Sequence, residues 1–221
     1  MKQAVAALHK EIVKTLDLQY IVYTPADFDP HADKKWPMIY FLHGINQRGS
    51  DIELVKKYGI PNNLEAGEEL PFIVVCPQCP AGSFWPLEND ALVALLGEIV
   101  EQYPVDRDRI YLTGYSMGGY GTWDLALKYP DMFAAISPVC GGLMPGRNLE
   151  SLKSLPIWTF HGDQDSVVPI RESQMVVDAL QAMGSSVQFT IYPGVDHDSW
   201  TETYQNPTLY AWFLQHTRAS Q

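Results

Sequence analysis

The chain has 221 residues, of which 46% are hydrophobic and 19% are charged. This composition is typical of a globular protein and argues against a disordered chain, and the length suits a single α/β domain over residues 1–221. The net charge of −11, with no cluster of Lys or Arg to offset it, would repel a phosphate backbone and argues against nucleic acid as a partner.

Short runs rich in β-branched and aromatic residues alternate with helical patterns along the chain. The predicted strands are Leu18–Thr24, Met38–Leu42, Phe72–Cys76, Ile110–Thr113, Ala134–Pro138, Ile157–Phe160 and Val187–Tyr192. The predicted helices are Leu87–Gln102, Met117–Lys128, Glu172–Met183 and Pro207–His216. The expected order is βαβα throughout, which is typical of a mostly parallel sheet covered by helices on both faces.

The longest apolar stretch, residues 91–96, is followed by Gly97 and Glu98 and is much shorter than the roughly 20 residues that span a bilayer. We therefore expect no transmembrane helix and no membrane partner. Residues 1–10 lack the apolar core of a signal peptide. We expect a cytoplasmic protein, or a secreted one if a leader or neighbouring domain was removed.

The cysteines are Cys76, Cys79 and Cys140, which are too few for a secreted disulfide scaffold and favour a reducing compartment. Cys76 and Cys79 have the spacing of a redox pair. The proline between them and the lack of a thioredoxin pattern favour a pair of buried thiols instead. A disulfide between them stays open as an alternative.

Residues 114–118 read Gly-Tyr-Ser-Met-Gly, between the predicted strand that ends at Thr113 and the predicted helix that begins at Met117. A serine on such a tight turn has a strained backbone that lifts its hydroxyl above the sheet, and the glycines allow the flanking segments to approach. We therefore predict that Ser116 is a nucleophile. The alternative is a serine that only caps the helix.

A serine hydroxyl is a weak nucleophile and needs a base, which in turn needs a carboxylate to orient and stabilise it. Candidates follow the last predicted strands, where residues 161–165 read His-Gly-Asp-Gln-Asp and residues 196–198 read Asp-His-Asp. We predict that His197 is the general base and that Asp165 is its partner, in the chain order Ser, Asp, His.

Other polar residues lie in the same loops. Asp163 is expected to cap or brace the turn and is the alternative acid, whereas Asp196 and Asp198 are expected to shape the loop around the base. His43 and His161 each precede a glycine at a strand end, and we expect them to form hydrogen bonds that stabilise loops. No spacing in the sequence suggests a metal site, and no metal or organic cofactor is expected.

The chain resembles the α/β-hydrolase superfamily, specifically the small carboxylesterases close to the dienelactone hydrolase, phospholipase/carboxylesterase and feruloyl esterase groups. The resemblance covers nearly the whole chain and is carried by residues 40–46, 114–123, 161–165 with Val168-Pro169, and 196–200. It implies an α/β-hydrolase fold and places the acid on Asp165 and the base on His197. Dienelactone hydrolases use a cysteine nucleophile, so Ser116 argues against that particular activity.

An acyl-transfer site also needs donors for the developing oxyanion. One expected donor is the backbone N–H of Met117, directly after the nucleophile. The resemblance implies that the N–H of Ile45 is the second. For Trp85 and Trp200 two alternatives are open: they line a pocket for the acyl or alcohol group, or they pack in the core. Core packing is expected for Trp123.

These residues predict a serine carboxylic ester hydrolase that acts through an acyl-enzyme on small-molecule esters, with short-chain acyl or feruloyl groups. A serine peptidase or a thioesterase on the same fold is the alternative, because the same residues cleave amides and thioesters. A catalytically silent binding module is a further alternative. The sequence does not indicate the oligomeric state.

Overall fold

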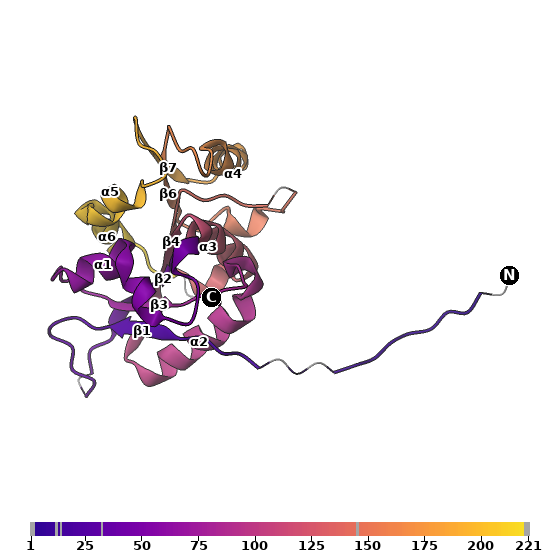
Figure 1. Cartoon of the computed structure of the whole chain (residues 1–221), viewed down its shortest axis with the longest axis horizontal. Coiled ribbons are helices and arrows are strands. Elements are labelled where there is room, and N and C mark those ends of the chain that lie inside the picture. Colours follow the sequence, from indigo (N-terminus) through magenta and orange to yellow (C-terminus); the bar gives the residue numbers. More distant parts are fainter. Residues whose placement is uncertain (1–2, 12, 14, 32, 145, 219–221) are drawn as a thin grey trace.

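The computed structural model describes residues 3–11, 13, 15–31, 33–144 and 146–218. Within this part of the chain, seven strands form one sheet in the order β1-β3-β2-β4-β5-β6-β7 (Figure 1). β1 pairs with β3 antiparallel, and the other neighbours pair parallel. The strands are β1 Tyr20–Tyr23, β2 Trp36–Leu42, β3 Ile73–Pro77, β4 Val105–Tyr115, β5 Ala135–Val139, β6 Trp158–Gly162 and β7 Gln188–Tyr192.

Helices cover both faces of the sheet (Figure 1). Their bounds are α1 Gly59–Glu65, α2 Asn89–Gln102, α3 Met117–Lys128, α4 Arg171–Ala182, α5 Trp200–Gln205 and α6 Pro207–Leu214. Apolar side chains of α2, α3 and α4 pack on one face, and those of α1, α5 and α6 pack on the other. Every residue of β2 is buried, and Tyr40 and Phe41 enter the cores on opposite faces. This continuous apolar run is expected for a central strand that is covered on both sides.

Each predicted strand overlaps an observed one, and the helices α2, α3, α4 and α6 were also predicted. The expectation of βαβα throughout is wrong in two places. Among the described residues, β1 and β2 are joined without a helix, and the connection from β5 to β6 contains only a 3₁₀ turn, Glu150–Leu152. The helices α1 and α5 were missed because, at 7 and 6 residues, they are too short to show a helical period.

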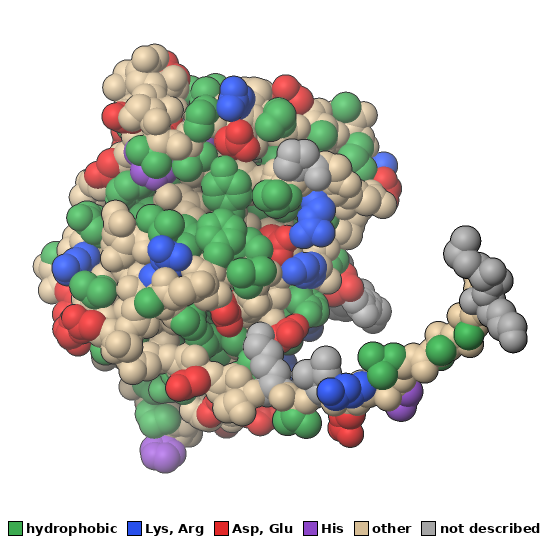
Figure 2. All heavy atoms as spheres, turned by 45° about the vertical axis from the view of Figure 1, so that its right-hand side comes forward, with side chains coloured by type: hydrophobic (Ala, Val, Ile, Leu, Met, Phe, Trp, Pro, Cys, Tyr) green, Lys and Arg blue, Asp and Glu red, His purple; other side chains and the backbone are tan. Residues whose placement is uncertain are grey.

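The segment before β1 runs away from the body of the protein (Figure 1). Its side chains are largely exposed, including Val5, Leu8 and Val13 at 94%, 89% and 87% (Figure 2). Met1 and Lys2, which belong to the segment that lacks the apolar core of a signal peptide, lie outside the described residues. None of the described helices is both long and apolar enough to cross a membrane.

α6 shows how local signals and packing combine in this fold. Asn206 precedes the helix and its side chain accepts a hydrogen bond from the Thr208 N–H at 3.0 Å, while Pro207 occupies the first helical position. Leu209 is completely buried against the sheet, whereas Leu214 at the other end of the helix is 38% exposed.

We therefore expect Leu209→Ala to lower the free energy of unfolding by about 2–5 kcal/mol, because it removes a buried side chain and leaves a cavity. The matched control Leu214→Ala should change it by less than about 1 kcal/mol, since its side chain is already partly in water. Urea denaturation followed by circular dichroism measures both. Equal effects of the two substitutions would contradict the assigned packing of α6.

Candidate active site

Ser116 lies on a tight turn between β4 and α3, with φ 55° and ψ −118°. Ser116 and Cys140 are the non-glycine residues with positive φ in the described part of the chain. The neighbouring glycines explain how this turn fits. A Cβ atom on Gly114 would lie 2.5 Å from the carbonyl oxygen of Leu42, and one on Gly118 would clash with the same oxygen. Only glycine at both positions allows the end of β2 to touch the turn.

Ser116, His197 and Asp165 are joined by consecutive hydrogen bonds, although they follow three different strands. His197 Nδ1 lies 2.7 Å from Asp165 Oδ2, and His197 Nε2 lies 2.9 Å from Ser116 Oγ. An ionised carboxylate only accepts hydrogen bonds, so Nδ1 carries the proton of the neutral ring. Nε2 is then free to accept the hydrogen of the Ser116 hydroxyl.

The Asp165 side chain is fully buried, and both of its oxygens have partners. Oδ1 accepts hydrogen bonds from the backbone N–H groups of Val167 at 2.9 Å and Val168 at 2.7 Å. Oδ2 accepts from His197 and also lies 3.2 Å from His161 Nε2. These contacts hold the carboxylate in one orientation toward His197.

His161 has a second set of contacts that fixes its ring. Nε2 lies 2.8 Å from the carbonyl oxygen of Val168, and Nδ1 lies 2.8 Å from Ser173 Oγ. Burial lowers the pKa of His161 below its ordinary value. The expected loop-stabilising role is confirmed, but its contact with Asp165 was not foreseen, because the sequence does not show that the ring turns back toward the same loop.

The neighbouring aspartates bind backbone groups rather than His197 Nδ1. Asp163 accepts from a backbone N–H in the turn after β7 at 2.7 Å, as expected for a brace. Asp196 accepts from the N–H and hydroxyl of Ser166, and these hydrogen bonds lower the pKa of Asp196. Asp198 accepts from the N–H of Thr201 in α5. The expectation that the last two shape the loop is confirmed.

The expected oxyanion donors lie at the ends of β2 and β4. Ile45 is the first residue of the 3₁₀ turn Ile45–Gln47, and Met117 is the first residue of α3. Their N–H groups precede the first turn of hydrogen bonds, and within the described residues neither has an acceptor. Both are therefore available to a ligand.

His43 supports the loop that carries Ile45. Its Nε2 accepts from the Cys79 N–H at 3.0 Å, and its Nδ1 faces the carbonyl oxygen of Gly44 at 2.6 Å. Burial lowers the pKa of His43 to about 4, so the ring is neutral near pH 7. The expectation that His43 stabilises a loop is confirmed.

Trp85 packs in the core and does not line a pocket for the acyl or alcohol group, which was the other expectation for it. Its side chain has no exposed surface, its Nε1–H donates to the carbonyl oxygen of His43 at 2.9 Å, and its ring packs against His43. A Cβ atom on Gly121 would lie 2.6 Å from Trp85 Cβ. Trp85 is therefore a core residue beneath the loop, and Trp123 is also fully buried.

Trp200 is half-buried and lies beside the predicted base. Its ring is 5.3 Å from that of His197 in an edge-on contact, and 4.5 Å from that of Tyr115. Tyr58, which is 46% exposed, packs edge-on against Trp200 at 6.3 Å. No sequence pattern pointed to Tyr58, because it lies far from Trp200 along the chain.

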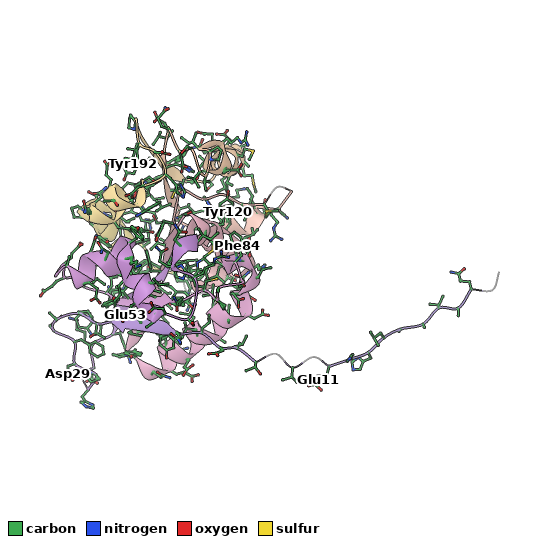
Figure 3. The ribbon with its side chains drawn as sticks, in the orientation of Figure 1. Glu11, Asp29, Glu53, Phe84, Tyr120 and Tyr192 are labelled. Carbon is green, nitrogen blue, oxygen red and sulfur yellow. The ribbon has the colours of Figure 1, made fainter. Side chains whose placement is uncertain are left out.

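A second aromatic pair lies at the start of α3. Tyr120 donates its N–H to the carbonyl oxygen of Ser116 at 3.1 Å, and its ring lies 6.2 Å from that of Phe84 (Figure 3). Both side chains are partly exposed. Partly exposed aromatic side chains thus accompany both the predicted nucleophile and the predicted base.

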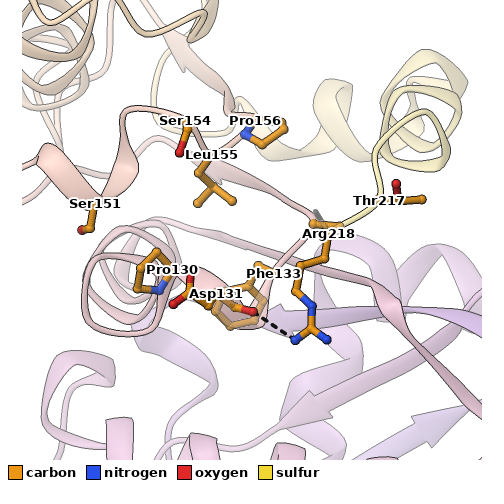
Figure 4. A pocket seen from close by; sticks show the side chains of 10 residues that line it. Pro130, Asp131, Phe133, Ser151, Ser154, Leu155, Pro156, Thr217 and Arg218 are labelled. Carbon is orange, nitrogen blue, oxygen red and sulfur yellow. Dashed lines mark hydrogen bonds between the residues drawn. The ribbon is translucent and has the colours of Figure 1, made fainter. Parts of the chain in front are cut away.

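A cavity of about 290 Å³ lies elsewhere, at the amino ends of β5 and β6 (Figure 4). Its lining includes Asp131 and Arg218, whose Nη1 donates to the Asp131 carbonyl oxygen at 3.1 Å. The Ser116, Asp165 and His197 side chains follow the carboxyl ends of strands, so this cavity is at the opposite edge of the sheet. Ligand sites of open parallel sheets lie at the carboxyl edge.

All three cysteines are free and buried, as favoured for Cys76 and Cys79. Burial raises the pKa of each thiol. Cys140 directly follows β5 and lies close to Asp165 and His197. No sequence pattern indicated this proximity.

Comparisons with known proteins show the family of this chain. A family model described as phospholipase/carboxylesterase matches residues 89–209. The chain is 25% identical over 200 residues to a bifunctional acetylxylan esterase/xylanase of Neocallimastix patriciarum, covering 86% of this chain and 27% of that protein. It is 31% identical over 161 residues to a probable carboxylesterase of Oryza sativa subsp. japonica, covering 69% of this chain and 58% of that protein.

Among solved structures, a thermostable esterase has 33% sequence identity and a TM-score of 0.77, covering 91% of this chain and 60% of that chain. The chain therefore spans less than two thirds of the length of each of these proteins. The sheet order and these matches confirm the predicted α/β-hydrolase fold. This chain belongs to the phospholipase/carboxylesterase family.

Proposed function

We propose that the chain is a serine carboxylic ester hydrolase with Ser116 as nucleophile, His197 as general base and acid, and Asp165 as the carboxylate that orients His197. The observation that carries this proposal is the pair of consecutive hydrogen bonds, 2.9 Å from Ser116 to His197 and 2.7 Å from His197 to Asp165. Family membership supports an ester as the substrate.

In the first half of the reaction, Ser116 Oγ attacks the ester carbonyl carbon while its proton passes to His197 Nε2. Asp165 accepts the Nδ1–H throughout and stabilises the imidazolium that forms. The N–H groups of Ile45 and Met117 bind the negative oxygen of the tetrahedral intermediate. The C–O bond then breaks, and His197 returns the proton to the leaving alcohol.

In the second half, His197 takes a proton from water, which attacks the acyl-enzyme carbonyl. Collapse of the second tetrahedral intermediate releases the carboxylic acid, and the proton on Nε2 returns to Ser116 Oγ. The neutral ring is thereby restored, with its proton again on Nδ1.

The proposed substrates are small esters with short-chain acyl or feruloyl groups. The relative named as an acetylxylan esterase/xylanase supports a small acyl group. The partly exposed Trp200 next to His197, and Tyr58 packed on it, support an aromatic acyl or alcohol group.

Ser116→Ala should lower kcat for p-nitrophenyl acetate, butyrate, octanoate and methyl ferulate by about 10⁴- to 10⁶-fold, because no other group forms the acyl-enzyme. Initial rates at neutral pH without added metal measure this. An acyl thioester and an aminoacyl anilide run in parallel test the alternative reactions. Equal rates in the variant and the native protein would disprove the mechanism, and a preferred thioester or anilide would disprove the ester assignment.

Two aspartates in one loop provide a matched test of the acid. Asp165→Asn should lower kcat by about 10³- to 10⁴-fold, because an amide at this position no longer stabilises the imidazolium. Asp163→Asn should change kcat by less than about tenfold, since Asp163 only braces a turn through a backbone N–H. The same ester assay measures both. A larger loss in Asp163→Asn would assign the acid to Asp163 instead.

Trp200→Leu should raise KM for methyl ferulate more than KM for p-nitrophenyl acetate, and the two increases should differ by roughly 2- to 10-fold. The reason is that the substitution removes an aromatic contact that an acetyl group cannot use. Trp158→Leu serves as the control, since Trp158 is also partly buried but lies at the start of β6 and packs on Trp212. Equal changes for both esters would show that Trp200 does not select the substrate.

A further inference from the structure

The Cys140 thiol lies close to two of the proposed catalytic residues, Asp165 and His197. Ligand atoms of Cys140, Asp165 and His197 all lie within 4.8 Å of one another. A thiolate, a carboxylate and an imidazole are each common zinc ligands, and three protein ligands with an open fourth position are enough to hold Zn²⁺. The proposed reaction uses the carboxylate and the imidazole but has no role for the thiol.

The surroundings of the thiol contain a further unused polar group. The Ser199 side chain is fully buried, and its hydroxyl has no hydrogen-bond partner within the described residues. This hydroxyl lies beside the Cys140 thiol, whereas the Ser116 N–H donates to the carbonyl oxygen of Val139 at 2.9 Å. A buried hydroxyl whose polar neighbour is only a weakly hydrogen-bonding thiol is unusual in a native protein, and it adds a second polar group on the Cys140 side of the cluster.

The imidazole and carboxylate ligand atoms need only a small movement to bind one ion. Zn–N and Zn–O bonds of about 2.0–2.1 Å at tetrahedral angles separate neighbouring ligand atoms by roughly 3.3 Å. Nδ1 of His197 and Oδ2 of Asp165 are now 2.7 Å apart, so this pair has to open by less than an ångström. The His197 side chain is 17% exposed, whereas that of Asp165 is fully buried, so the ion enters past the imidazole.

We propose that Cys140, Asp165 and His197 form an inhibitory site for a thiophilic divalent cation such as Zn²⁺. That the ion inhibits rests on the proposed ester hydrolysis, whereas metal binding by these three residues does not. The ion binds the Nδ1 lone pair, so the ring proton moves to Nε2 and the thiol loses its proton to solvent. With Nε2 protonated and Asp165 engaged by the ion, His197 no longer accepts the proton of Ser116.

The first test compares inhibition of p-nitrophenyl acetate hydrolysis by buffered Zn²⁺ in the native protein, Cys140→Ala and Cys79→Ala. Each rate is divided by the rate of the same protein with EDTA. Loss of the sulfur ligand should raise the half-inhibiting concentration by roughly tenfold or more in Cys140→Ala. Cys79→Ala should match the native protein, because Cys79 is a buried thiol that lies outside this cluster.

The second test needs no enzyme activity. Co²⁺ added to the Ser116→Ala protein, which keeps all three ligands, should produce a thiolate-to-cobalt charge-transfer absorption. This absorption should persist when Cys79→Ala is added and disappear when Cys140→Ala is added. The cobalt test stays informative if Cys140→Ala does not fold, because the spectrum of the Ser116→Ala protein alone shows whether a thiolate binds the metal.

Absence of the cobalt absorption, or its persistence without Cys140, would overturn the site. Equal zinc inhibition in Cys140→Ala and the native protein would do the same, because the ion would then act elsewhere. If the metal-free protein hydrolyses no ester, the proposed function is wrong. The cobalt absorption would then still test the metal site by itself.

Discussion

The carbonyl oxygen of Leu42 touches the turn that carries Ser116, and much of the site depends on this contact. The Leu42 oxygen lies against Gly114 and Gly118, so a side chain on either glycine would push the end of β2 away from α3. The same approach brings together the loop that contains Ile45 and the first turn that contains Met117. The positive φ of Ser116 is a strained conformation that costs on the order of 1–3 kcal/mol and persists because the packed segments on both sides hold it.

The other half of the site is held by carboxylates that bind backbone N–H groups. Asp165 accepts two such hydrogen bonds, and Asp163 and Asp196 link the loop after β6 to the loop after β7. Charge-assisted hydrogen bonds of this kind are stronger than neutral ones and are directional. They fix the positions of Asp165 and His197 in loops that contribute few apolar side chains to the core.

The sequence predicted the strands because they are short runs rich in β-branched and aromatic residues, and the longer helices because their apolar residues repeat with a helical period. It predicted the turn at Ser116 because glycines flank the serine there. α1 and α5 were missed because they are shorter than the window in which a helical period becomes visible. The burial of Trp85 could not be predicted, since it depends on contact with Gly121 in another element. The same holds for Cys140, whose neighbours Asp165 and His197 approach it only when β5, β6 and β7 lie side by side.

The long sequence separations within the site have a consequence for folding. Ser116 and His197 are 81 residues apart, and His197 and Asp165 are 32 apart, yet each pair shares one hydrogen bond. The bonded residues follow β4, β6 and β7, so both bonds depend on non-local strand pairing, which is slow compared with helix formation. The proposed reactivity of Ser116 should therefore return late in refolding, after helical circular dichroism has recovered, which would make it a probe of the completed sheet.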